Sequence, residues 1–355
     1  MNFSKWVKAF LLLLTAALVL VGAVTAVIDP FFHYHAPLRS LQYELYYQRY
    51  QNDGIVKHFD YDAILTGNSL SENFLASQLD ALFGVRSVKV PFSGASPKEL
   101  DENNSAAIKA NPNIKMLVMN LDYGSFIKDK DSMSYDADDY PVFLYNANPF
   151  DDVKYLFNKD ILASSLKVLR YTAAGNRTTS FDAYSFWGND PETAYGEAAI
   201  KASFDPGYGS GEIYSLDAER RELLRGNIEQ NVVRLVEENP QIDFYFFYPP
   251  YSMYFWAKMY NIGELSLQLE AERAVTELLI DYENVHLFSF LDAFELVSDY
   301  NRYKDYIHYD ADVNAWMLEC MAKDEHRLTR ENLDSYTEKT RKYYSEYDYD
   351  AFFAG

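Results

Sequence analysis

The stretch that decides the fold runs from Ala63 to Asn73 and reads AILTGNSLSEN. A short apolar run ends at a glycine, and the polar residues after the glycine lead directly into a helical pattern. Such a run is typical of a buried strand that passes into a helix. Ser69 then lies at a strand-to-helix turn, where unpaired backbone N–H groups at the positive end of the helix stabilise developing negative charge. This position suits a nucleophile.

The same alternation of apolar runs and helical patterns continues along the chain. We expect strands at Ala63–Thr66, Ser87–Phe92, Met116–Leu121, Asp243–Tyr248 and Val285–Phe290. We expect helices at Asn73–Phe83, Pro97–Ala110, Leu216–Glu238, Glu264–Tyr282 and Val313–Lys323. Nearly continuous apolar strands that alternate with helices indicate a parallel sheet. The sequence therefore predicts an α/β fold, a three-layer α/β/α sandwich with a five-stranded parallel sheet, whose site lies at the carboxyl ends of the strands.

The alternation stops between residues 125 and 215, a segment rich in Tyr, Asp, Asn and Gly. We interpret it as an insertion or lid that shapes substrate access, with a plain surface subdomain as the alternative. The tail, residues 329–355, is charged and rich in tyrosine, and the sequence leaves open whether it docks as a helix or stays mobile. We therefore expect three regions: residues 1–29 as cytoplasmic stub and membrane anchor, residues 30–328 as the α/β domain, and the tail.

The N-terminus carries the candidate membrane anchor. From Ala9 to Ile28 twenty residues carry no charge, and Lys5 and Lys8 precede them. At about 1.5 Å per residue this run spans roughly the 30 Å of a hydrocarbon core. The two lysines predict a cytoplasmic leading end and a single-pass protein of the cell membrane, with the bulk of the chain extracytoplasmic. The alternatives are a signal peptide cleaved after Ala26, which gives a secreted protein, and a buried core helix.

The net charge, the single cysteine and the aromatic content of the chain limit the ligands and partners that we expect. Thirty-two Lys and Arg against 53 Asp and Glu give a net charge of −21, so phosphate backbones repel the chain and nucleic acid is not expected as a partner. The one cysteine, Cys320, makes no internal disulfide and excludes a cysteine-based metal cluster. Aromatic residues reach 17% of the chain, and tyrosine at this level suits carbohydrate ligands, interfaces and surface packing alike.

Asp305 and His308 form a second candidate element after the last expected strand. A nucleophilic serine needs a base, and that base needs a group that fixes its tautomer and stabilises the imidazolium. An Asp and a His three residues apart in a turn place the carboxylate against the ring. We therefore expect Ser69, His308 and Asp305 to form a catalytic triad. The rival carboxylates near the histidine are Asp299, Asp310 and Asp312.

Other interpretations of these residues stay open. The letters SLSE from Ser69 fit a capping box, in which the serine only begins the helix. The turn also lacks the second glycine of the nucleophile elbow of α/β hydrolases. Gly94, after the second strand, lets backbone approach a ligand closely, so its N–H is either a candidate oxyanion donor or part of an ordinary turn. Ser96, followed by Pro97 and Glu99, is assigned to helix capping.

The ordered set of Gly67-Asn68-Ser69, Gly94 and Asp305-x-x-His308 resembles the SGNH (GDSL-like) hydrolases. In that family the first serine is the nucleophile and the D-x-x-H pair completes the triad. Serine and glycine N–H groups and an asparagine side chain form the oxyanion hole. The resemblance covers roughly Asp62 to Glu319 outside the insertion, and it implies the SGNH/flavodoxin-like fold.

The sequence departs from the family pattern in two blocks. Asn68 stands where the first block usually has Asp, and residues 120–123 read NLDY where the third block usually reads G-x-N-D. Aligned strictly, Asp122 takes the place of the oxyanion asparagine, although a carboxylate donates a hydrogen bond only when protonated; Asn120 is the alternative. The oxyanion candidates are thus Ser69, Gly94, Asn120 and Asp122. The candidates for the lining of a substrate groove are Asn68, Tyr123 and Tyr251.

Neither of two possible metal-binding clusters is favoured, and we expect no metal and no cofactor. His33 and His35 lie just beyond the anchor without a nearby carboxylate cluster. The acidic residues Asp136, Asp138 and Asp139 lack the spacing of an EF-hand loop and are interpreted as a solvated loop.

The anchor and the motifs together resemble the exported branch of the family, such as alginate O-acetylation proteins and the teichoic acid D-alanylation protein. The resemblance implies an extracytoplasmic serine esterase or acyltransferase. Its substrate would be the O-acyl groups of a cell-surface carbohydrate polymer, or an acylated small molecule. The alternatives are a non-catalytic surface protein that binds glycans, and an accessory to a membrane O-acyltransferase, which would then be a partner.

Overall fold

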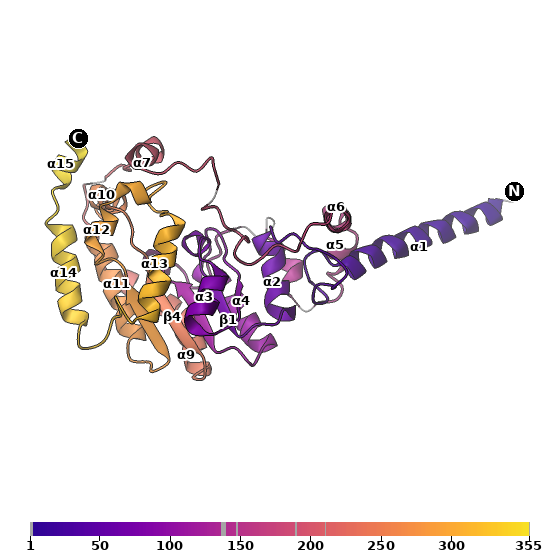
Figure 1. Ribbon diagram of the computed structural model, residues 1–355, viewed down its shortest axis with the longest axis horizontal. Helices are drawn as coiled ribbons and strands as arrows, with labels where there is room; N and C mark the ends of the chain where they lie inside the picture. Colours follow the sequence, from indigo (N-terminus) through magenta and orange to yellow (C-terminus); the bar gives the residue numbers. More distant parts are fainter. Residues whose placement is uncertain (1–2, 136–139, 147, 189, 210, 355) are drawn as a thin grey trace. The chain divides into compact units, whose positions relative to one another are not determined.

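The computed structural model describes residues 3–135, 140–146, 148–188, 190–209 and 211–354 of the chain (Figure 1). The chain forms two compact units. The first comprises Met1–Asp60 and Tyr135–Ser180, and the second comprises Tyr61–Ser134 and Phe181–Gly355. The segment predicted as an insertion therefore contributes to both units.

The second unit is built on a five-stranded parallel sheet, which confirms the predicted sheet and the α/β class. Its strands are β1 (Ala63–Thr66), β2 (Ser87–Lys89), β3 (Met116–Asn120), β4 (Asp243–Tyr248) and β5 (Val285–Ser289). Their order is β2-β1-β3-β4-β5, and each neighbouring pair is parallel. Ala63 of β1 lies opposite Ser87 of β2 and Met116 of β3. All five carboxyl ends therefore meet at one edge of the sheet.

Helices follow the strands, as predicted, and several more occur. The predicted helices are α3 (Ala76–Phe83), α4 (Pro97–Ala110), α8 (Ala218–Ile228) with α9 (Arg234–Glu238), α11 (Leu265–Leu279) and α13 (Ala311–Ala322). The others are α7 (Glu197–Ser203), α10 (Met253–Asn261), α12 (Phe294–Val297), α14 (Leu333–Ser345) and α15 (Tyr349–Ala354). Short turns of helix occur at η1 (Ser69–Ser71), η2 (Tyr123–Phe126) and η5 (Tyr300–Arg302). Helix α3 begins later than predicted because residues 72–75 form a turn and an extended link between η1 and α3.

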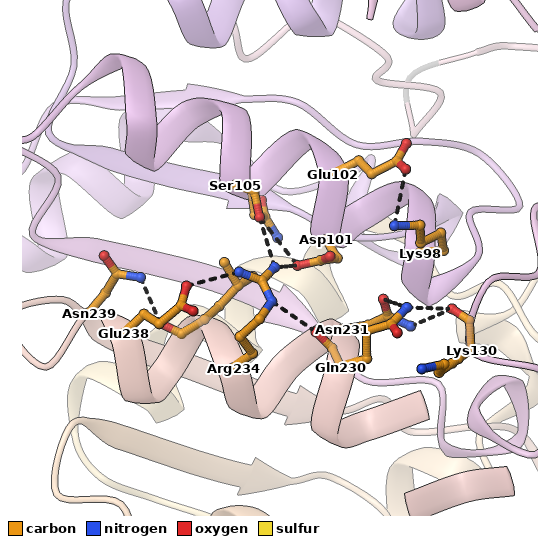
Figure 2. Close-up of polar contacts among 12 residues, drawn as sticks. Lys98, Asp101, Glu102, Ser105, Lys130, Gln230, Asn231, Arg234, Glu238 and Asn239 are labelled. Carbon is orange, nitrogen blue, oxygen red and sulfur yellow. Dashed lines mark hydrogen bonds and ion pairs between the residues drawn. The ribbon is translucent and has the colours of Figure 1, made fainter. Parts of the chain in front are cut away.

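The link between α8 and α9 is a π-helical segment, η4 (Glu229–Val233), and polar contacts fix it in place. Figure 2 shows Arg234 of α9, whose Nη2 donates to Asp101 Oδ1 at 2.7 Å and to Ser105 Oγ at 3.1 Å on α4. Asn231 donates to the carbonyl oxygen of Lys130 at 2.9 Å. The π segment and the first residue of α9 thus join the loop that follows β3 to α4.

The tail docks as a helix, which was one of the two outcomes left open. Tyr344 of α14 is fully buried, and its ring stacks on Trp256 with 4.1 Å between ring centroids. Its hydroxyl donates to the carbonyl oxygen of Leu291 at 2.6 Å. Tyr336 donates to Oε1 of the buried Glu272 on α11 at 2.8 Å. Helix α14 is therefore part of the packed second unit.

The first unit contains α1 (Phe3–Ile28), α2 (Gln48–His58), η3 (Val142–Leu144), α5 (Val153–Leu156) and α6 (Lys159–Ala173). Helix α1 is long and apolar enough to span a membrane, and most of its side chains are exposed. Only its carboxyl-terminal turns are buried, at Gly22, Thr25 and Ile28, and α1 contacts both α5 and α6. The apolar helix predicted at the N-terminus is therefore present.

A buried carboxylate fixes the chain where α1 ends. Asp29 accepts hydrogen bonds from the backbone N–H groups of His33, Tyr34 and His35, at 2.8 to 3.0 Å. The Tyr155 hydroxyl of α5 donates to the same carboxylate at 2.6 Å. Charge-assisted bonds of this kind satisfy a buried charge. Asp29 thus joins the end of α1, the segment after it and α5.

Candidate active site

The turn after β1 places Ser69 at the carboxyl edge of the sheet. Gly67 has a φ of 129°, and a Cβ atom there would come within 2.1 Å of Asn120 Oδ1, so the turn requires glycine. Asn68 caps the turn η1 by accepting a hydrogen bond from Leu70 N at 3.0 Å. The side chain of Asn68 therefore stabilises the turn, and the Ser69 hydroxyl is left for another contact.

Ser69, His308 and Asp305 form a row of hydrogen bonds. Ser69 Oγ lies 2.8 Å from His308 Nε2, and His308 Nδ1 lies 2.8 Å from Asp305 Oδ2. With Nδ1 protonated, the imidazole donates to the carboxylate, and Nε2 accepts the serine proton. The structure thus brings together a serine and a histidine that are 239 positions apart in the chain.

Asp305 is held in the ionised form that this arrangement needs. Burial raises the pKa of its carboxyl, but hydrogen bonds from the His308 ring and from the backbone N–H groups of His308 and Ile307 outweigh burial and hold the pKa below its ordinary value. An ionised carboxylate at Nδ1 fixes the tautomer of the ring and stabilises an imidazolium.

The rival carboxylates make contacts elsewhere. Asp310 caps α13 by accepting from Val313 N at 3.0 Å. Arg302 pairs with both Asp310 and Asp312, at 3.0 and 3.3 Å. Asp299 caps η5. Asp305 is therefore the carboxylate that the structure places on the His308 ring.

The turn of Ser69 and the loop of His308 are also tied together by contacts behind the site. The carbonyl oxygen of Leu70 accepts from Asn314 Nδ2 at 2.9 Å, and the Tyr309 hydroxyl lies 3.4 Å from the same oxygen. Lys304 N donates to the carbonyl oxygen of His308 at 3.0 Å, which closes the loop. These bonds keep the distance between the serine and the imidazole short.

Asn120 is better arranged than Asp122 to donate a hydrogen bond. Asn120 Oδ1 accepts from Asn68 N at 2.9 Å and from Ser71 Oγ at 3.0 Å, so the orientation of the amide is fixed. Its Nδ2 is buried and has no hydrogen-bond partner among the residues that the structure describes. Burial raises the pKa of Asp122, while backbone N–H groups of the following residues, Gly124 and Ser125, bond to its carboxyl.

The loops after β1, β2 and β3 meet at a cavity of about 20 Å³, roughly large enough for one water molecule. It is lined by residues from these loops and from η4, among them Asn68, Ala95, Asn120, Asp122 and Asn231. Gly94, beside Ala95, is exposed and has a φ of 63°, a left-handed conformation that suits glycine. Ser96 caps α4 through Glu99 N, as predicted.

Two candidates for a substrate groove lie in the interior instead of at the surface. Tyr123 is fully buried and Tyr251 is 4% exposed. The ring of Tyr123 contacts those of Tyr248 and Tyr251, at 5.7 and 6.2 Å between centroids, and Tyr251 stacks on Phe255. These rings pack beneath the loop after β3 and present no face to a ligand.

The structure instead places Trp187 beside the imidazole, with Lys304 on the Trp187 ring. The Trp187 ring contacts that of His308 edge-on, at 5.8 Å between centroids, and Lys304 Nζ lies 3.6 Å above the Trp187 ring. Asn73 Oδ1 accepts from the backbone N–H groups of Trp187 and Gly188, at 3.1 and 3.0 Å. Sequence reasoning missed this tryptophan because it lies in the segment without regular periodicity.

Lys89, the last residue of β2, braces the segments around the site. Its Nζ donates to the carbonyl oxygens of Glu72 at 2.7 Å, Phe74 at 3.0 Å and Asp182 at 3.3 Å. Burial lowers the pKa of Lys89 to about 7, against the attraction of Asp182 and Glu72. The lysine thus joins the chain after Ser69 to the segment that leads to Trp187. This role could not be predicted from the sequence, because a single lysine in a strand belongs to no recognisable motif.

The histidines near the anchor have structural contacts. His33 Nε2 lies 3.4 Å from Asp152, and the ring nitrogens of His35 face the carbonyl oxygens of Ala36 and Ala26. Within the described ranges, no group of three or more His, Cys, Asp or Glu side chains is arranged to hold a metal ion. The acidic residues at 136, 138 and 139 lie outside those ranges.

Comparison of the chain with protein-family models, with curated proteins and with solved structures found no match. The site is therefore interpreted from its own geometry.

Proposed function

We propose that the protein is a membrane-anchored, extracytoplasmic serine esterase or acyltransferase of the SGNH type, which acts on O-acyl groups of a carbohydrate polymer or of an acylated small molecule. The observation that carries this proposal is the row of Ser69, His308 and Asp305, joined by two contacts of 2.8 Å. Nucleophile, base and orienting acid in this order are the components of acyl transfer.

The residues support a two-step reaction. Ser69 Oγ attacks the acyl carbonyl carbon while its proton passes to His308 Nε2, and the tetrahedral intermediate collapses as the ester C–O bond breaks. His308 returns the proton to the departing alcohol, which leaves an acyl group on Ser69. Water, or a sugar hydroxyl, then gives its proton to His308 and attacks the acyl carbon; the bond to Ser69 Oγ breaks, and His308 returns the proton to Oγ, which restores the serine. The first acceptor makes the protein an esterase and the second an acyltransferase.

The oxyanion would be bound by the backbone N–H groups of Ser69 and Gly94 together with Asn120 Nδ2. The fixed amide of Asn120 and its unpartnered Nδ2 support this assignment over Asp122. Loss of one such donor typically costs about 100- to 1,000-fold in rate.

The strand order and the helix contacts support the three-layer arrangement of the SGNH type. The order β2-β1-β3-β4-β5 is that of flavodoxin-like sheets. Helices α3 and α13 contact one another, while α11 contacts α8 and η4 contacts both α4 and α9. We assign these two groups of helices to opposite faces of the sheet.

Lys304 supports a substrate with negative charge near its ester. Lys304 Nζ rests on the Trp187 ring, and no carboxylate pairs with it within the part of the chain that the structure describes. In a chain with a net charge of −21, an unpaired cation on the ring next to the imidazole would attract a phosphate or carboxylate group. The ring beside it offers an apolar face.

The end of α1 supports an anchor that is retained. Ile28 is buried, its carbonyl oxygen accepts from the Tyr43 hydroxyl at 2.9 Å, and Asp29 N donates to the carbonyl oxygen of Thr25. Cleavage after Ala26 would cut through this packed region. Lys5 and Lys8 support the cytoplasmic placement of the other end.

The proposal is tested on the full chain in detergent with a fluorophosphonate probe and with 4-nitrophenyl acetate. We expect labelling and turnover that disappear in Ser69→Ala and fall strongly in His308→Ala. Ser77→Ala, an exposed serine on α3, is the matched control and should behave as the parent protein.

Equal labelling of the parent protein and Ser69→Ala would refute the triad. Glycan binding that survives Ser69→Ala, with no turnover of any ester, would favour the non-catalytic alternative. Turnover that appears only when a membrane O-acyltransferase is added would favour the accessory role.

A further inference from the structure

We infer that helix α6, together with α5, lies on the membrane surface with a second apolar stripe facing the lipid. All residues concerned belong to the first unit, and the inference is independent of the proposed catalytic activity.

Helix α6 has two apolar stripes, and only one of them is covered by protein. Ile161, Ser165 and Val168 are buried and face the core of the first unit. A second set, one residue further along, repeats at the same helical spacing: Leu162, Leu166, Leu169 and Ala173. Leu166 is 45% exposed and Leu169 is 41% exposed. At 100° per residue this second stripe lies on the side of the helix next to the buried one.

The neighbouring helix and loop extend the apolar surface. Val153 and Phe157 of α5 are 56% and 46% exposed, and Phe150 before α5 is 83% exposed. Large apolar side chains exposed on two helices that contact one another indicate an interaction surface. The surface therefore comprises Phe150, Val153, Phe157, Leu166 and Leu169, and we refer to it as the α5–α6 surface.

The α5–α6 surface is continuous with the candidate membrane span. The ring of Phe157 lies against Gly22 of α1, within 3.5 Å of the position that a Cβ atom would take there. Both α5 and α6 contact α1 near its buried carboxyl-terminal turns. The lipid that surrounds the exposed side chains of α1 thus reaches the α5–α6 surface directly.

The level at which α5 and α6 contact α1 agrees with the depth of an interfacial helix in a bilayer. The uncharged run from Ala9 to Ile28 spans roughly the 30 Å of a hydrocarbon core, so Gly22–Ile28 corresponds to its last 9 Å or so. Interfacial helices bury their apolar face about 5–10 Å into the boundary between headgroups and acyl chains. Helices that contact α1 at this level lie where an interfacial helix is expected.

Charged side chains flank the stripe in the manner of interfacial helices. Lys159 and Arg170 are exposed on α6, at the side of the leucine stripe that is remote from the protein core. Lys154 is exposed on α5. Long basic side chains of this kind extend from an apolar surface to the lipid headgroups. The occupant that fits the surface is therefore a lipid bilayer.

The test uses the full chain with Cys320→Ser, reconstituted into vesicles of phosphatidylcholine and phosphatidylglycerol. Single cysteines at Leu166→Cys and Leu169→Cys carry an environment-sensitive fluorophore, and spin-labelled lipids act as quenchers. Asp160→Cys, an exposed position on the opposite side of α6, is the matched control. Leu14→Cys in α1 reports on the insertion of the anchor itself.

We expect blue-shifted emission at 166 and 169 and lipid quenching about twofold or more above that at 160. All three positions are exposed, so the substitutions are expected to leave the fold intact, which circular dichroism checks. Quenching at 166 and 169 no greater than at 160 overturns the inference and indicates water or a protein partner on the α5–α6 surface. An unquenched probe at position 14 overturns it as well, because α1 would then lie outside the bilayer.

Discussion

Asp305 gives His308 both orientation and charge. Its Oδ1 accepts from the backbone N–H groups of Ile307 and His308, at 2.8 Å each, while Oδ2 faces the ring nitrogen Nδ1. The backbone contacts hold the side chain in place, and the negative charge acts on the ring. An amide at this position would keep much of the first effect and lose the second.

Asp305→Asn should therefore lower kcat for 4-nitrophenyl acetate by about 1,000- to 10,000-fold with little change in fold, because the imidazolium loses its counter-charge and the ring its preferred tautomer. The measurement is steady-state hydrolysis by the full chain, with circular dichroism as the check on folding. A variant with the kcat of the parent protein would show that the carboxylate has no catalytic role.

Lys304 is the residue through which substrate charge can be tested. Lys304→Met keeps an apolar chain over Trp187 but removes the cation. We expect KM for a 4-nitrophenyl ester with a free carboxylate to rise about tenfold, since a charged contact of this kind is worth roughly 1–2 kcal/mol. KM for the neutral acetate should not change.

Lys109→Met, which removes an exposed lysine at the end of α4, is the control. If it raised KM for the charged ester as much as Lys304→Met does, net charge and not the site would be responsible.

The individual residues of the site differ in how well their positions can be predicted from the sequence. The structure brings Ser69, Asp305 and His308 together as the sequence predicts, because the carboxyl ends of strands in a parallel sheet converge. The tyrosines were harder to place, because their composition suits surface and interior alike. Tyr123 and Tyr251 are in fact buried among other rings. Trp187 is held near His308 by hydrogen bonds from its own and the next backbone N–H group to Asn73. No motif or residue spacing in the sequence predicts these bonds.

At the scale of elements, α11 and α14 share a buried carboxyl group. Glu272 of α11 is 2% exposed and accepts from the Tyr336 hydroxyl of α14. Burial raises the pKa of Glu272 to about 7. The folded protein then holds a proton at Glu272 that the unfolded chain releases once the pH exceeds its ordinary pKa.

As pH rises from about 4.5 to about 7, the unfolded chain loses this proton more readily than the folded protein, so the free energy of unfolding should fall. Above about pH 7 the carboxyl group is ionised in both states, and its effect on stability should be constant. In Glu272→Gln this contribution is absent. The difference in unfolding free energy between parent and variant should change by about 3 kcal/mol across that window.

Guanidinium unfolding of both proteins at pH 4.5, 6 and 8 measures this difference. An equal difference at all three pH values would contradict the assignment, because the carboxyl group would then titrate alike in both states.

Element boundaries show why prediction succeeded for the sheet and was less complete for its surroundings. Strands β1 and β4 have the predicted bounds because their apolar runs end abruptly at polar or turn residues. Helix α4 has the predicted bounds because Ser96 and Pro97 mark its start. Helix α10 was not predicted, and for α14 the sequence leaves a docked helix and a mobile tail equally open, because its many charged residues and tyrosines suit either.

At the scale of the molecule, the charge is unbalanced. Fifty-three acidic residues against 32 basic ones leave a net charge of −21, and like charges repel one another more in the compact state than in the unfolded chain. Many of the basic side chains pair with neighbouring acids at the surface, as Arg225 does with Glu229, and such pairs contribute little to stability.

Salt should therefore stabilise the protein. Raising NaCl from about 20 mM to about 500 mM shortens the Debye length several-fold and screens the repulsion between acidic side chains, so we expect the midpoint of thermal unfolding to rise by several degrees. Differential scanning fluorimetry of the detergent-solubilised chain measures it. A midpoint that falls with salt would mean that ion pairs outweigh repulsion.

The hydrogen bonds to Asp29 hold α1 rigidly to the chain that follows it. Three backbone N–H groups and the Tyr155 hydroxyl converge on that carboxylate, one residue beyond the helix. A span whose apolar length differs from the local bilayer thickness tilts to compensate. If α1 spans a membrane, as proposed, such a tilt would rotate the rest of the first unit with it, and bilayer thickness would set the angle at which this unit meets the lipid.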